Sequence, residues 1–162
     1  MPALSSRLLY RSKAVIQNKT VEILLVEDND DDLDLTMRAL RKANVSNHIE
    51  AVRDGQEALD FLFGEGDYAH RNIANQPRVV LLDLKLPKID GLEVLRILKQ
   101  NELTRTIPVV ILTSSREDRD ISTAYDLGVN SYIVKPVNFE SFSTAVAELG
   151  LYWLLLNQPH RE

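Results

Sequence analysis

Polar side chains follow the apolar runs of this sequence, each at the point where a run ends. Carboxylates that converge repel one another unless a cation lies between them. Sites built only from oxygen ligands suit Mg²⁺, which takes one or two carboxylates together with phosphate oxygens. A hydroxyl and an ammonium beside such a site balance the charge of a transferring phosphoryl group. The side chains that predict this phosphoryl-handling Mg²⁺ site are Glu27, Asp28, Asp83, Thr113 and Lys135.

Asp83 is the predicted nucleophile of this site. It lies centrally in the expected arrangement, and an aspartyl phosphate is a known type of covalent product. Taken alone, an Asp at the end of a strand is more often a helix cap, and Thr-Ser-Ser is usually a turn. The coincidence of such residues at four strand ends favours the site. The neighbouring Asp30, Asp31 and Asp32 lack that placement. We interpret them as first-turn helix residues in solvent, favoured by the helix dipole.

The apolar runs themselves predict a parallel sheet. Continuous Val/Ile/Leu runs fit parallel strands that are buried on both faces. A weaker run, 48–52, alternates with polar residues and is expected at an edge. The stronger runs are 21–26, 78–83, 107–113 and 131–135.

Helical stretches are predicted between these runs, so that β and α alternate five times. This order predicts one α/β domain with a doubly wound parallel sheet. With the strand order 2-1-3-4-5, ligands bind beyond the carboxyl ends of strands one and three, where Glu27, Asp28 and Asp83 should converge. The predicted helices cover 31–43, stretches that begin at Asp54 and Asp90, 118–128 and 138–156, and 63–77 is predicted as a long surface loop.

Composition excludes several other classes of protein. The net charge of -5 argues against nucleic acid or an anionic membrane surface as the main partner. The chain has no cysteine, which excludes disulfides and thiolate metal sites. No apolar run approaches the roughly 20 residues of a membrane span. The basic segment 1–20 is either a transit peptide or, as we expect, a flexible N-terminal arm. The domain is expected over 21–156, with a short tail at 157–162.

Taken together, these motifs resemble the receiver domain of two-component response regulators. The resemblance covers residue 21 to about residue 156, and it implies a flavodoxin-like (βα)₅ fold. It also implies a cytoplasmic, single-domain signalling protein, not an enzyme, that takes a phosphoryl group from a sensor histidine kinase. The stretches that carry the resemblance are "VEDN" (26–29), "LLDLKLPKIDG" (81–91), "LTSS" (112–115) and "YIVKP" (132–136).

The resemblance implies a role for individual residues. Asp83 matches the phosphorylated aspartate, Thr113 the switch hydroxyl and Lys135 the phosphate-binding lysine. Tyr132 matches an aromatic that turns inward when the threonine engages the phosphoryl group, a population shift between two preexisting arrangements. The implied Mg²⁺ ligands are Glu27 through water, Asp28, Asp83 and the backbone carbonyl of Lys85.

The segment "AELGLYWLLLNQP" (147–159) resembles more narrowly the single-domain regulators of bacterial phytochromes. This implies a phytochrome-type histidine kinase as partner. Two interpretations of its apolar stripe stay open. The stripe forms a homodimer contact through the C-terminal helix and neighbouring surface, or it folds back on its own domain or arm. The residues of the stripe are Phe139, Phe142, Val146, Leu149, Trp153 and Leu156.

A Mg²⁺-dependent phosphohydrolase with an aspartyl-phosphate intermediate is the alternative function. The haloacid-dehalogenase type needs a second Asp two residues after the nucleophile, where this sequence has Lys85. A nucleotide-binding fold would place Gly, Ser and Thr after the first strand to cradle phosphate, whereas carboxylates repel it. An EF-hand fails because Leu33 and Ala39 occupy the positions of its Gly and Glu.

Overall fold

The structure is a computed structural model that describes residues 21–44, 48–135 and 138–153 of the 162-residue chain. Strands and helices alternate along it, as the sequence predicts. The predicted arm 1–20, the end of the predicted C-terminal helix after residue 153 and the tail 157–162 lie outside the described residues. In chain order the elements are β1 (Ile23–Val26), α2 (Asp30–Lys42), β2 (Ile49–Val52), α3 (Gly55–Phe63), the 3₁₀ turn η1 (Gly66–Tyr68), β3 (Val79–Leu82), α4 (Gly91–Gln100), β4 (Val109–Thr113), α5 (Asp118–Asp126), β5 (Ser131–Val134) and α6 (Phe139–Leu151).

Within the described residues the strands form one parallel sheet in the order β2-β1-β3-β4-β5. This confirms the predicted doubly wound topology. The central strands β1, β3 and β4 are buried along their whole length, as their continuous branched runs predict. The edge strands β2 and β5 are mostly half-buried, and β2 is the weaker alternating run.

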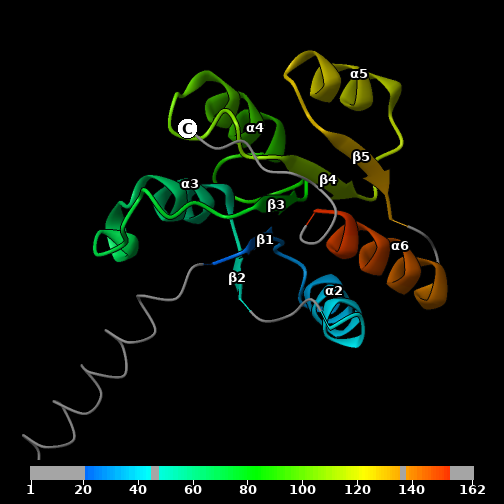
Figure 1. Cartoon of the computed structure of the whole chain (residues 1–162). Coiled ribbons are helices and arrows are strands. Elements are labelled where there is room, and N and C mark those ends of the chain that lie inside the picture. Colours follow the sequence, from blue (N-terminus) through cyan, green and yellow to red (C-terminus); the bar gives the residue numbers. More distant parts are fainter. Residues whose placement is uncertain (1–20, 45–47, 136–137, 154–162) are drawn as a thin grey trace, which may run out of the picture.

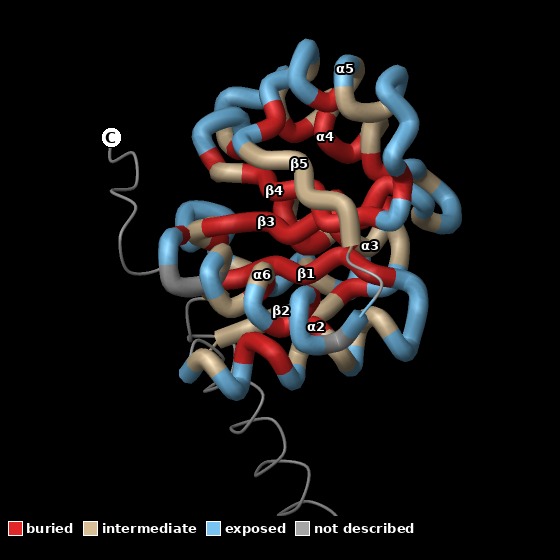
Figure 2. Tube along the Cα trace, turned by 90° about the vertical axis from the view of Figure 1, so that its right-hand side faces the viewer, coloured by how far each residue is buried: buried red, intermediate tan, exposed pale blue. Residues whose placement is uncertain are grey.

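Helices cover both faces of the sheet (Figure 1). One face packs against α3, α4 and α5, and the other packs against α2 and α6. Successive residues of a strand point to opposite faces, so Leu24 belongs to the first core and Ile23 to the second. Figure 2 shows the buried strands as a layer between helices whose outer sides are exposed. No helix in the described parts of the chain is long and apolar enough to span a membrane.

The apolar stripe of α6 covers the protein's own sheet. Phe142, Val146 and Trp153 are 4%, 0% and 9% exposed, and Leu149 packs partly against the same core. The interpretation that this segment folds back on its own domain therefore accounts for these residues. Leu156 lies outside the described residues.

Two helices begin beside the predicted site. Asn29 caps α2 by accepting the Asp32 N–H at 2.9 Å, and Asp90 caps α4 by accepting the Glu93 N–H at 2.9 Å. Gly91 lets α4 start close to the end of β3, because a Cβ there would lie 2.2 Å from the carbonyl oxygen of Asp83.

The segment 63–77 after α3 is a long surface loop, as its lack of periodicity predicts, and most of its residues are exposed. It contains the 3₁₀ turn η1, and the Tyr68 ring packs edge-on against Phe61 with 5.2 Å between centroids. The Arg71 guanidinium stacks on the same Phe61 ring, with its Cζ 3.6 Å from the ring centroid. The Tyr68 hydroxyl donates to Glu57 at 2.9 Å, and to Glu50 at 3.4 Å. These contacts fasten the loop to α3 and to the edge strand β2.

Candidate functional site

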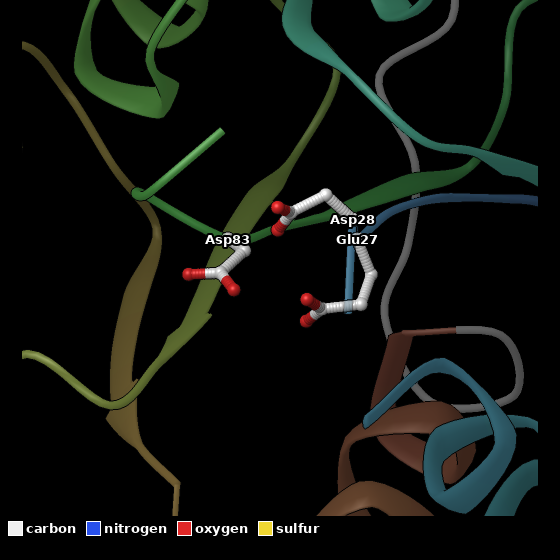
Figure 3. A group of neighbouring side chains, drawn as sticks. All are labelled: Glu27, Asp28 and Asp83. Carbon is white, nitrogen blue, oxygen red and sulfur yellow. The ribbon is translucent and has the colours of Figure 1, made fainter. Parts of the chain in front are cut away.

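Three carboxylates meet beyond the carboxyl ends of β1 and β3. These strands are neighbours with Val26 paired to Leu82, so the residues that follow each strand share one rim of the sheet. Glu27, Asp28 and Asp83 each place a carboxylate oxygen within 4.8 Å of the others. Figure 3 shows the carboxylate groups facing a common space. The predicted convergence is confirmed in the structure.

These carboxylates differ in burial. Glu27 and Asp83 are 3% and 8% exposed, whereas Asp28 is exposed to solvent. The possible metal ligands in this group are all carboxylate oxygens. A cation that keeps part of its hydration shell fits such an open, oxygen-only cluster. The residues present therefore suit a hard divalent cation such as Mg²⁺.

Lys135 joins the site from the far end of the sheet. Its ammonium nitrogen Nζ donates to Glu27 Oε2 at 2.7 Å, to Asp32 Oδ2 at 2.8 Å and to Asp83 Oδ2 at 3.1 Å. Burial alone would lower the pKa of Lys135. The hydrogen bonds to Asp32 and Glu27 and the charge of Asp83 outweigh burial, so the Lys135 pKa is raised above its usual range. The ammonium therefore stays charged among the carboxylates.

Glu27 is a buried acid with a raised pKa. Burial raises its pKa to about 7, and the charge of Asp83 acts in the same direction. The hydrogen bond from Lys135 and the backbone N–H of Asn29, 3.1 Å from Oε1, oppose that rise. A buried acid with opposed influences of this size is typical of functional sites.

The two oxygens of Asp83 have different partners. Oδ1 accepts the backbone N–H of Leu84 at 2.7 Å, and Oδ2 accepts from Lys135. The backbone N–H of Asp83 donates to Val26 at 3.1 Å, which continues the β1–β3 ladder to the site. The carboxylate is thus fixed in direction before any ligand arrives.

Thr113 and Tyr132 occupy the neighbouring strands. Thr113 ends β4 fully buried, and its hydroxyl oxygen accepts the Ser115 N–H over a long 3.4 Å. Tyr132 lies on β5 and donates its hydroxyl to the carbonyl of Ser115 at 3.0 Å. The Ser115 hydroxyl donates to Asp120 on α5 at 2.5 Å. The β4–α5 loop therefore connects these two side chains.

Lys85 lies in the turn between β3 and α4 and is exposed. This turn is closed by the backbone N–H groups of Leu86 and Gly91, which both donate to Leu84 O, at 3.1 Å and 2.8 Å. These bonds hold the backbone of the turn in which Lys85 follows Asp83 by two residues.

Asp32 is the residue that the sequence did not assign to the site. Asp30, Asp31 and Asp32 do form the acidic first turn of α2, as predicted, but Asp32 is half-buried and bonded to Lys135. Asp30 also has a partner, because it pairs with Arg53. No spacing rule marks Asp32 in the sequence, because Asp28 precedes α2 and the direction of the first helical turn depends on the Asn29 cap.

Comparison with known proteins places this arrangement in a family. The family model "Response regulator receiver domain" matches residues 23–147, which include every residue of the site. The chain belongs to the response regulator receiver family. The curated protein "Probable methanogenesis regulatory protein FilR2" of Methanothrix harundinacea is 48% identical over 84% of this chain and 85% of its own. "Response regulator Rcp1" of Synechocystis is 39% identical over 82% of this chain and 88% of its own.

Solved structures agree with this assignment and with the fold. The phosphorylated cyanobacterial phytochrome response regulator RcpA matches with a TM-score of 0.81 and 39% identity, over 88% of this chain and all of its own. The Mn²⁺-bound form of Rcp1 matches with a TM-score of 0.80 and 36% identity, over 87% and 99%. The bacteriophytochrome response regulator AtBRR is 53% identical, with a TM-score of 0.68 over 86% and 99%. This receiver is therefore homologous to phytochrome response regulators, and it has the flavodoxin-like receiver fold.

Proposed function

We propose that this receiver is a phosphorylation switch that accepts a phosphoryl group from a sensor histidine kinase on Asp83. The observation that carries the proposal is the placement of the Asp83 carboxylate, buried between an acidic pair and the Lys135 ammonium. A buried carboxylate without a charged partner takes up a proton. This carboxylate instead faces the Lys135 ammonium and a cluster of oxygens that can bind a metal cation.

In the proposed reaction an Asp83 oxygen attacks phosphorus while the bond from phosphorus to the kinase histidine breaks. The electron pair of that bond returns to the imidazole, and the product is an acyl phosphate on Asp83. Lys135 supports the charge of the transferring group from one side. Mg²⁺, held by Glu27, Asp28, Asp83 and the Lys85 carbonyl, would supply positive charge to the phosphoryl oxygens.

The readout is proposed to run through Thr113 and Tyr132. A phosphoryl group on Asp83 offers an anionic oxygen as a hydrogen-bond acceptor. The Thr113 hydroxyl can donate a hydrogen bond to that oxygen. Because Ser115 contacts both Thr113 and Tyr132, a shift of Thr113 changes the loop that holds the tyrosine hydroxyl. Phosphorylation then stabilises one of two arrangements of the β4–α5 loop and β5.

Incubation with acetyl phosphate and Mg²⁺ tests the proposal without a kinase. The wild-type chain should gain one phosphoryl group, and removal of Mg²⁺ with a chelator should stop the gain. Asp83→Asn should take up none, and Asp126→Asn, an exposed acid on α5, is the matched control and should label like wild type. Sustained turnover of unrelated phosphomonoesters would favour the phosphohydrolase instead, an alternative that receiver-family membership disfavours.

We also propose that the kinase is of the phytochrome type. Support comes from the similarity to RcpA and to the bacteriophytochrome response regulators. FilR2, at 48% identity, carries a different regulatory name, so this step needs its own test. Phosphotransfer from a panel of purified kinases should be fastest from a phytochrome kinase. Equal or faster transfer from kinases of other input classes would remove this assignment.

A homodimer through α6 and the adjacent edge strand β5 is the proposed assembly. The support is a hollow between these elements, beside Tyr152, which is 49% exposed. β5 has a free edge in the described sheet, and edge strands favour association with a second copy. Because Trp153 is buried in its own domain, Tyr152→Ser is the better probe in sedimentation. Identical monomeric behaviour of wild type and variant would remove the dimer.

A further inference from the structure

Asp32 completes the set of acceptors around the Lys135 ammonium. A lysine ammonium carries three N–H donors and no acceptor. Three carboxylates take those donors at 2.7, 2.8 and 3.1 Å, from Glu27, Asp32 and Asp83 in that order. The two shorter bonds go to Glu27 and Asp32, which lie away from the proposed phosphoryl acceptor in the chain.

Asp32 is itself held in place from both sides. Its backbone N–H donates to the Asn29 side chain at 2.9 Å, and its carbonyl accepts the hydroxyl of the buried Thr36 at 2.8 Å. Asn29 also donates its backbone N–H to Glu27 Oε1 at 3.1 Å. Asn29 therefore binds the Glu27 carboxylate and the backbone of Asp32, the two residues with the shorter hydrogen bonds from Lys135.

The hydrogen bonds of Lys135 to Glu27 and Asp32 determine where its third N–H points. A lysine has a flexible four-carbon stem and loses about 2 kcal/mol of rotamer freedom when it is fixed. With two donors engaged by Glu27 and Asp32, the remaining donor is directed to Asp83 Oδ2. Once Asp83 carries the phosphoryl group as an acyl phosphate, that donor is free to turn to a phosphoryl oxygen while the other two bonds remain.

We propose that Asp32 is a positioning residue that holds the Lys135 ammonium beside Asp83 Oδ2, within reach of a phosphoryl group on Asp83. The inference rests on the proposed function and extends it to a residue outside the strand ends. Asp31, its exposed neighbour in the same first turn of α2, has the same charge and supplies the matched control.

The test compares wild type, Asp32→Asn and Asp31→Asn in the 162-residue chain. Asparagine has nearly the shape of aspartate and the Asp32 side chain is 36% exposed, so the variant keeps its fold. Phosphorylation by acetyl phosphate in saturating Mg²⁺ is followed by intact mass. Both variants lose one negative charge near an anionic donor, so general electrostatics affects them alike. Asp32→Asn should be about five-fold slower than Asp31→Asn, the loss expected for one charge-assisted hydrogen bond at a half-exposed site.

A second readout reports on Lys135 itself. In protein labelled with ¹⁵N-lysine, the Lys135 ammonium, assigned by its absence in Lys135→Met, should exchange with water faster in Asp32→Asn than in Asp31→Asn. Equal phosphorylation rates in the two variants would overturn the proposal. A slower rate with unchanged ammonium exchange would also overturn it, since Asp32 would then act through charge alone. If wild type takes up no phosphate, the proposed function fails, and the ammonium exchange alone decides whether Asp32 positions Lys135.

Discussion

Lys135 Nζ lies 3.1 Å from Asp83 Oδ2, although β4 separates the strand that precedes Asp83 from the strand that precedes Lys135. The lysine reaches across because its backbone N–H is bonded to the Thr113 carbonyl at 2.7 Å, at the end of the strand between them. The sheet order thus places a cation from the edge of the sheet over a carboxylate at its centre.

Removal of this cation should destabilise the protein strongly. Lys135→Met leaves the Glu27 and Asp83 side chains, 4% and 10% exposed, without their shared partner. Breaking such a buried set costs about 2 to 4 kcal/mol in the free energy of unfolding. Urea denaturation without Mg²⁺ measures the loss, and saturating Mg²⁺ should recover part of it.

Lys99→Met is the control for that prediction. Lys99 is also half-buried, but it donates to the backbone carbonyls of Arg105 and Ile107 and to the side-chain oxygen of Asn130. Its loss should not respond to Mg²⁺. A Mg²⁺-independent loss for Lys135→Met as well would contradict the shared-cation account.

Mg²⁺ should stabilise the wild-type fold through the acidic cluster. A ligand that binds only the folded state raises its stability by about 2.7 kcal/mol at a hundred-fold excess over Kd. In the absence of metal, Asp28→Asn should melt at a higher temperature than wild type, because it removes one of three repelling carboxylates. Differential scanning calorimetry with and without Mg²⁺ checks both points. A metal-dependent shift in Asp28→Asn as large as in wild type would exclude Asp28 as a ligand.

Tyr132→Phe should cost about 1 kcal/mol of stability, the usual value for one hydrogen bond. The variant loses the 3.0 Å bond to the Ser115 carbonyl and keeps the ring. Labelling of Asp83 by acetyl phosphate should be nearly unchanged, because the hydroxyl is bonded to the loop and not to the carboxylate cluster. Loss of labelling in a stable Tyr132→Phe protein would place the tyrosine in the reaction instead of the readout.

Because of Glu50, the folded state should lose stability as the pH rises above the usual pKa of a glutamate. Burial raises the Glu50 pKa, and the charge of Glu57 adds to this, although the Tyr68 hydroxyl opposes it. The folded state then keeps its proton to a higher pH than the unfolded state, so unfolding is favoured as the pH rises between the two pKa values. Glu50→Gln should flatten this part of the stability curve. If the stability of Glu50→Gln fell over that interval as steeply as the stability of wild type, Glu50 would not contribute to the pH dependence.

The sequence predicted the convergence of Glu27, Asp28, Asp83 and Lys135 because parallel strands bring their carboxyl ends to one edge. It did not predict the contact of Asp32 with Lys135. That contact depends on the direction in which a helix cap sends its first turn, and neither charge nor spacing alone determines that direction. The sheet order, by contrast, follows from the alternation of strands and helices together with general topological rules.

The loop 63–77 shows why other parts could not be read from the chain. Tyr68 and Arg71 pack on Phe61, but no periodic pattern marks a loop that is held by individual contacts. The stripe of α6 was visible as a period, yet a period cannot say which surface it meets. In the structure Phe142 and Val146 meet the protein's own sheet.

The most direct test of the account is the position of the phosphoryl group. After reaction with acetyl phosphate and Mg²⁺, borohydride reduces an aspartyl phosphate to homoserine, which peptide mass spectrometry can locate. We expect homoserine at position 83, and none in unreacted protein or in Asp83→Asn. Homoserine at another aspartate, or phosphate that stays on the Asp83→Asn chain, would contradict the claim that Asp83 is the phosphoryl acceptor.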